Sequence, residues 1–94
     1  MLHNYESLFI LNPELDETAM DNLIDFIQKS MEKSGKVKEV NRWGLKRLAY
    51  PIKKHDNGFY VLFEYESKPE VISKLKEEWK IKDGIIRFNV IRKK

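Results

Sequence analysis

The chain has 94 residues, of which 41% are hydrophobic and 35% charged, and it contains no cysteine. The length predicts a single domain spanning residues 1–94, and the composition excludes both a disordered tail and disulfide or thiolate chemistry. The N-terminal residues lack the pattern of a signal peptide, and no segment has the length of an apolar membrane span, so we expect a soluble cytoplasmic protein.

The net charge of +3 is unevenly distributed along the chain. Residues 1–35 hold seven acidic and two basic residues, whereas residues 36–55 hold seven basic and one acidic, and residues 81–94 five basic and one acidic. Such clustering favours a surface that binds a polyanion. Lysines that only protect a strand edge from aggregation would give a similar pattern, so charge alone leaves both interpretations open.

The first third of the chain predicts a strand followed by a helix. Residues 3–11 are apolar on both faces towards their end, which is typical of a central strand, and Asn12-Pro13 ends it. Apolar residues at helical spacing predict a helix over residues 17–34, with Asp16 as its N-cap. We expect Gly35 to end this helix in the left-handed conformation.

The middle of the chain predicts a hairpin. A long second strand over residues 36–50 contains Gly44, which suggests a bulge, and Pro51 after it indicates a sheet edge. The segment "HDNG" at 55–58 has turn chemistry, and residues 59–66 form the third strand directly after it.

The last third predicts a second helix and a final strand. Ser67 and Glu70 have the spacing of a capping box at the start of the helix, "KDG" at 82–84 ends it, and residues 85–92 form the strand. The order β-α-β-β-α-β predicts the ferredoxin-like arrangement of the α+β class, a four-stranded antiparallel sheet with both helices on one face. The first and third strands would be central, which places both basic segments on the edge strands.

The sheet face without helices is predicted to carry exposed apolar side chains. In the third strand, both alternating sets of side chains include large apolar groups, so either orientation leaves some of them uncovered. An uncovered apolar face favours a binding surface, although lysine and arginine stems or a loop could cover it. The two sets are Phe59, Val61, Phe63 and Tyr65, and Tyr60, Leu62, Glu64 and Glu66.

The sequence offers no catalytic, metal or cofactor site. His3 lies near the terminus and His55 in the predicted turn, and no cluster of ligands has metal-binding spacing. The four glycines are scattered, so no glycine-rich loop could hold a phosphate. We therefore do not expect an enzyme.

Several segments resemble a bacterial ribosomal family. "GLKRLAYPI" at 44–52 followed by "GFYVLFEYE", the opening "NYESLFILNPELDE" and the closing "DGIIRFNVIRK" are similar to the family of the sixth protein of the small ribosomal subunit. The resemblance covers essentially the whole chain. It implies a ferredoxin-like fold and a structural role in the ribosome. It also implies binding to the central domain of 16S ribosomal RNA, together with small-subunit ribosomal protein number eighteen, during assembly of the platform.

Charge and resemblance together suggest which residues make these contacts. The expected protein-partner residues are Trp43, Leu45 and Leu48, and Tyr50 could equally stack on a base or pack under the hairpin. Basic residues on the two edges would meet RNA phosphates. With Tyr50, the candidate RNA-binding residues are Arg42, Lys46, Arg47, Lys53, Lys54, Arg87, Arg92 and Lys93, extended by Lys94.

Two alternatives share the predicted fold. An RNA-recognition module has the same order of elements and stacks bases on third-strand aromatics, with Tyr60 as the candidate here, although the matching motif is incomplete. A ferredoxin-like domain that binds a small ligand is the other alternative, because this scaffold carries many functions.

Overall fold

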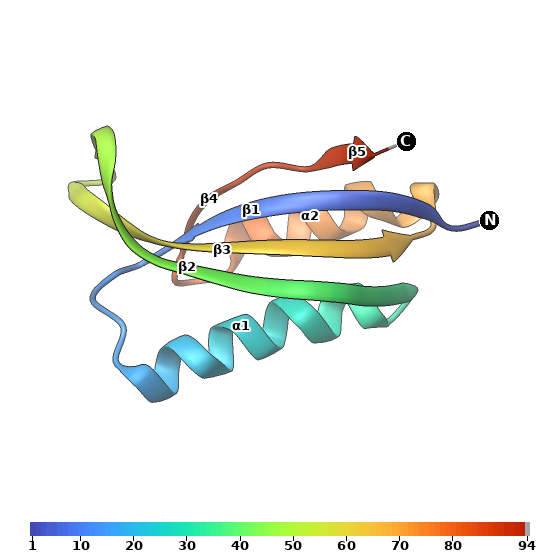
Figure 1. Cartoon of the computed structure of the whole chain (residues 1–94), viewed down its shortest axis with the longest axis horizontal. Helices are drawn as coiled ribbons and strands as arrows, with labels where there is room; N and C mark the ends of the chain where they lie inside the picture. The colour runs from blue at the N-terminus through green and yellow to red at the C-terminus, as the bar shows by residue number, and fades with distance from the viewer. Residues whose placement is uncertain (94) are drawn as a thin grey trace.

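The chain folds into one antiparallel sheet with both helices on the same side (Figure 1). The computed structural model describes residues 1–93. The strands are β1 (His3–Leu11), β2 (Gly35–Ile52), β3 (His55–Ser67), β4 (Ile85–Phe88) and β5 (Ile91–Lys93). The helices are α1 (Glu17–Glu32), the 3₁₀ turn η1 (Pro69–Val71) and α2 (Ile72–Ile81).

The strand order β2-β3-β1-β4 places β1 and β3 in the centre, as expected, and β5 continues the last edge by pairing with β1. The predicted ferredoxin-like α+β fold is confirmed. The hairpin that joins β2 to β3 extends beyond the rest of the sheet and bends away from α1 (Figure 1).

The core lies between the sheet and the helices because alternate residues of the central strands face that side. Phe9 of β1 is fully buried and makes edge-to-face contacts with Phe63 of β3 and Trp79 of α2, at centroid distances of 5.4 and 5.0 Å. The indole Nε1 of Trp79 donates a 3.0 Å hydrogen bond to Ser30 Oγ of α1. This polar pair therefore joins the two helices inside a core that is mainly aromatic and aliphatic.

The predicted turn between β2 and β3 lies earlier in the chain than expected. Lys53 and Lys54 form it, with positive φ angles of 50° and 69°, and Ile52 pairs with His55 across it. The expected turn residue Gly58 instead lies inside β3, where an added Cβ would collide with the side chain of Ile10. A close approach of side chains, rather than a turn, explains this glycine.

Two helix ends also differ from the prediction, while the N-cap of α1 is confirmed. Asp16 Oδ1 accepts a 2.7 Å hydrogen bond from the Ala19 amide. Gly35 does not end α1 in the left-handed conformation but begins β2, where an added Cβ would collide with the carbonyl oxygen of Glu66. Ser67 does not cap α2 because it is buried at the end of β3, and the chain enters the helix through η1.

Two irregularities shape the edge strands. The predicted bulge in β2 is confirmed, since Gly44 has a φ of 91° and the register shifts between Arg42 and Gly44. The expected single last strand is divided at Asn89. There, the backbone amide donates to the Leu8 carbonyl, and the side-chain Oδ1 accepts from the Leu8 amide. The side chain of Asn89 thus replaces one backbone hydrogen bond between the strands, and it separates β4 from β5.

Candidate nucleic-acid interface

Five predicted RNA-binding residues lie on the elements at the end of the sheet where the β2–β3 hairpin bends. Lys46 and Arg47 lie on β2, paired with Gly58 and Asn57 of β3; Lys53 and Lys54 form the turn; and Arg87 lies on β4, paired with Ile10 of β1. All five are exposed. We call this set the hairpin-end surface: Lys46, Arg47, Lys53, Lys54 and Arg87.

The charges of the hairpin-end surface are not neutralised within the chain. Among residues 1–93, none of the five lies within ion-pair distance of a carboxylate. Exposed lysine and arginine side chains that have no internal partner can each meet a phosphate oxygen without first breaking an ion pair. The arrangement therefore concentrates positive potential at one end of the molecule.

Tyr50 holds the tip of the hairpin to the opposite edge strand. Its hydroxyl accepts a 3.0 Å hydrogen bond from Arg87 Nη1, while 59% of the residue remains exposed. This contact joins the end of β2 to β4, and Lys53 of the turn lines the same groove as Arg87. Tyr50 is thus positioned as a bridge between the two basic edges.

An aromatic stack supports Lys46 on the same face. The Lys46 ammonium lies 5.7 Å from the centroid of the Trp43 ring, and Trp43 stacks on Tyr60 with a centroid distance of 6.4 Å and an interplanar angle of 6°. Tyr60 was the stacking residue of the alternative RNA-recognition module. One face of its ring is already stacked on an indole.

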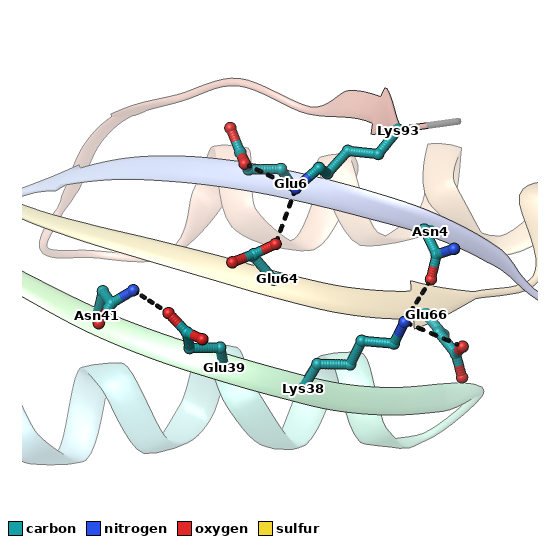
Figure 2. A network of polar contacts seen from close by, with 8 residues as sticks. All are labelled: Asn4, Glu6, Lys38, Glu39, Asn41, Glu64, Glu66 and Lys93. Carbon is teal, nitrogen blue, oxygen red and sulfur yellow. Dashed lines mark hydrogen bonds and ion pairs between the residues drawn. The ribbon is translucent and has the colours of Figure 1, made fainter.

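At the opposite end of the same sheet face, lysines are paired with carboxylates, which outnumber them (Figure 2). Lys93 of β5 reaches across β1 to Glu64 and Glu6, with Nζ–O distances of 2.8 and 3.5 Å. The hydrogen bond and charge of Glu64 raise the pKa of Lys93. Lys38 of β2 makes an equivalent bridge to Glu66 and Asn4.

The remaining predicted basic residues lie apart from the hairpin-end surface. Lys93 belongs to the ion-pair network just described, and Arg92 lies beside it on β5, opposite Tyr5. Arg42 of β2 points towards α1, where its Nη1 lies 2.8 Å from Asp21 Oδ1. Lys94 lies outside the described residues.

The three predicted partner-facing residues are divided between surface and interior. Trp43 and Leu45 are 48% and 63% exposed, and Leu45 borders a groove between β2 and the start of α1 that includes Leu15 and Phe59. Leu48, by contrast, is only 7% exposed because its side chain packs over Gly58. Leu48 packs inside the bent hairpin, so the expectation that it faces a partner does not agree with its burial.

Two lysines that are not among the predicted RNA-binding residues share a groove with Arg87. Lys76 and Lys80 of α2 line a groove that Lys53 and Arg87 also line. Their spacing of four residues on a helix was visible in the sequence. Which way that helix face points depends on the packing of α2, which the sequence pattern did not indicate.

Within residues 1–93, no three histidine or carboxylate side chains are grouped so that they could hold a metal ion. No helix in the described part of the chain is long and apolar enough to cross a membrane.

The chain is similar to known proteins along almost its entire length. The family model of ribosomal protein S6 matches residues 4–92. The chain is 44% identical to small ribosomal subunit protein bS6 of Clostridium novyi (strain NT), covering 96% of both proteins. It is 36% identical to bS6 of Caldanaerobacter subterraneus, covering 97% of both.

A solved structure agrees with these sequence matches. The crystal structure of 30S ribosomal protein S6 from Thermotoga maritima superimposes with a TM-score of 0.92 at 29% identity, covering 99% of this chain and 89% of that one. The family resemblance found in the sequence motifs is thereby confirmed. The chain belongs to the ribosomal protein S6 family and is a structural protein of the small subunit of the cytoplasmic ribosome.

Proposed function

We propose that this chain binds small-subunit ribosomal RNA through the hairpin-end surface, together with small-subunit ribosomal protein number eighteen, during assembly of the platform. The observation that carries the proposal is the presence of five exposed cations on β2, the turn and β4 at one end of the sheet, without carboxylate partners among the described residues. Membership of a ribosomal family supports RNA as the polyanion.

The chemistry of the surface fits the phosphate backbone rather than base edges. Lysines and arginines that neutralise phosphates release counterions, so the logarithm of the binding constant falls by roughly 0.7–0.9 per contact for each tenfold rise in salt. Five contacts would give a slope of about −3.5 to −4.5. Between 50 and 200 mM salt, the same relation corresponds to a loss of affinity of roughly 100- to 500-fold.

The neighbouring part of β2 suits the protein partner. Trp43 and Leu45 are exposed apolar side chains on an edge strand whose outer side pairs with no described strand. Such an edge offers backbone hydrogen bonds to an added strand, and the groove beside Leu45 offers an apolar seat for a side chain. A partner bound there would lie next to Lys46 and extend the surface available to RNA.

The test reverses two charges of the surface. We expect K46E/R47E to bind 16S ribosomal RNA roughly 15- to 30-fold more weakly at 0.15 M salt, from the loss of two phosphate contacts, and to lower the salt slope by about 1.4–1.8. The matched control is K68E/K74E, which changes the net charge equally at exposed positions without an ion pair among residues 1–93. Equal binding by both variants, or a greater loss in Tyr60→Ala, would overturn the proposal.

The role of the partner is tested separately. We expect ribosomal protein number eighteen to tighten RNA binding by the wild type, and the uncharged polar substitution Leu45→Asn to remove that gain while binding of RNA alone is unchanged. An unaltered gain in Leu45→Asn would place the partner elsewhere.

A further inference from the structure

A basic groove runs beside the hairpin-end surface, between α2 and the outer edge of β4. Its volume is about 460 Å³, and its apolar floor includes Trp79 and Phe88. Four of its ten lining residues are cations and none is acidic: Lys53, Lys76, Lys80 and Arg87. Lys53 and Arg87 belong to the hairpin-end surface as well, so the two surfaces are continuous.

Glu78 of α2 and the two lysines that line the groove lie on different faces of the helix. Glu78 points towards α1, where it lies 4.0 Å from Lys33. Lys76 and Lys80 instead line the groove, one helical turn apart. Two like charges at this spacing destabilise an isolated helix by about 0.2–0.5 kcal/mol. The helix dipole favours Lys80, which lies in the last turn, but not Lys76 in the middle of the helix.

Within the described part of the chain, the two lysines are not held in ion pairs that would offset this repulsion. Neither Lys76 nor Lys80 forms an ion pair among residues 1–93. An unfavourable local charge pattern without internal compensation is typical of a functional surface. An anion seated between the two lysines would supply the missing negative charge.

The other wall of the groove adds backbone donors. β4 is an edge strand, paired with β1 on its inner side and with no described strand on its outer side. Its outward amides can donate to an anion that enters the groove. The strand spans only Ile85–Phe88 before Asn89 interrupts the ladder, and so short an edge offers few hydrogen bonds to an added peptide strand.

We propose that this groove binds a second stretch of the ribosomal RNA backbone, with Lys76 and Lys80 each contacting a phosphate. The inference rests on the proposed function, because RNA held at the hairpin-end surface is what leads a strand past Lys53 and Arg87 into the groove. A phosphodiester chain fits better than an acidic peptide, since the cations follow a continuous path and the free strand edge is short.

The test compares a double variant of the two groove lysines with a matched control in which Lys68, just before η1, and Lys74 of α2 are changed. We expect K76E/K80E to bind 16S ribosomal RNA roughly 15- to 30-fold more weakly than the wild type at 0.15 M salt, with a salt slope lower by about 1.4–1.8. K68E/K74E should keep the slope of the wild type. Thermal unfolding should be similar for both variants, because all four side chains are exposed.

Four other results would each overturn the groove inference, and the first of them would overturn the proposed function as well. If the wild type does not bind RNA, the proposed function fails and the groove inference fails with it. If K46E/R47E weakens binding but K76E/K80E matches K68E/K74E, only the groove inference is wrong. An oligoglutamate peptide that binds the wild type but not K76E/K80E, with RNA binding unchanged, would identify a peptide site instead. A rise in RNA affinity in K76E/K80E would also overturn the inference.

A second measurement reports where the RNA lies on the protein rather than how tightly it binds. The chain has no cysteine, so Lys80→Cys and Lys74→Cys each create one unique thiol for a photo-crosslinker. We expect crosslinks to 16S ribosomal RNA from position 80 and few from position 74. Equal yields from the two positions would contradict a groove-bound strand.

Discussion

The two lysines of the turn at Lys53 and Lys54 should lower the stability of the fold and strengthen its binding to RNA. Both residues have positive φ angles, the pattern of a type I′ hairpin turn, in which asparagine and glycine are preferred. The left-handed conformation costs a residue with a side chain roughly 1–2 kcal/mol. Glycine avoids this cost but loses about 0.5–1 kcal/mol more chain entropy on folding, so its net gain is the difference between the two. We therefore expect K53N/K54G to be more stable than the wild type by up to about 1.5 kcal/mol.

The same change should weaken RNA binding, because it removes two cations of the hairpin-end surface. We expect a loss of roughly 15- to 30-fold at 0.15 M salt. The matched control, K53Q/K54Q, removes the same charges but keeps the strained backbone, so it should lose RNA affinity equally without gaining stability.

The assays are urea unfolding and RNA titration of the same protein preparations. A gain of 1 kcal/mol would raise the melting temperature of a domain of this size by about 4–8 °C. If K53N/K54G is no more stable than K53Q/K54Q, the strain argument is refuted. If both variants bind RNA as tightly as the wild type, the turn lysines do not contact phosphate.

Three further predictions concern buried polar groups and one ion pair. Ser30→Ala leaves the Trp79 indole N–H buried without its acceptor, so urea unfolding should show a loss of about 1–3 kcal/mol; a loss below about 0.5 would contradict this account. Burial raises the pKa of Tyr65 to about 12, so the native state retains its proton between the unfolded value near 10 and that value. The free energy of unfolding should consequently fall by up to about 2–3 kcal/mol as pH rises through this window, and Tyr65→Phe should flatten that dependence. Asp21→Asn should change stability by less than about 1 kcal/mol but tighten RNA binding up to about fivefold, because it releases Arg42; unchanged binding would exclude Arg42 from the interface.

The features that were predicted correctly depend on signals within one segment. The alternation in β3 was visible in its residues, and only the choice of face remained open; Phe63 faces the helices because it meets Phe9 in the core. Asp16 caps α1 through a hydrogen bond that spans three residues. Gly44 marks its bulge because few other residues adopt its φ angle.

The features that were missed depend on contacts between distant segments. Two consecutive lysines are poor candidates for a left-handed turn, whereas "HDNG" has the residues typical of one. Gly58 is instead needed because it lies close to Ile10. The ion pair of Arg42 with Asp21 joins β2 to α1, and that of Lys93 with Glu64 joins β5 to β3. Their formation requires the register of the folded sheet, so charge counts along the chain could not separate them from the unpaired cations.

Lysine reactivity in the assembled small subunit tests the central claim most directly. Acetylation of each lysine would be compared by mass spectrometry between the free protein and the subunit-bound protein. The account predicts strong protection of Lys46, Lys53 and Lys54 on assembly, with Lys68 and Lys74 reacting as they do in the free protein. Protection of Lys68 and Lys74 with continued reactivity at the hairpin end would show that the molecule binds through a different surface.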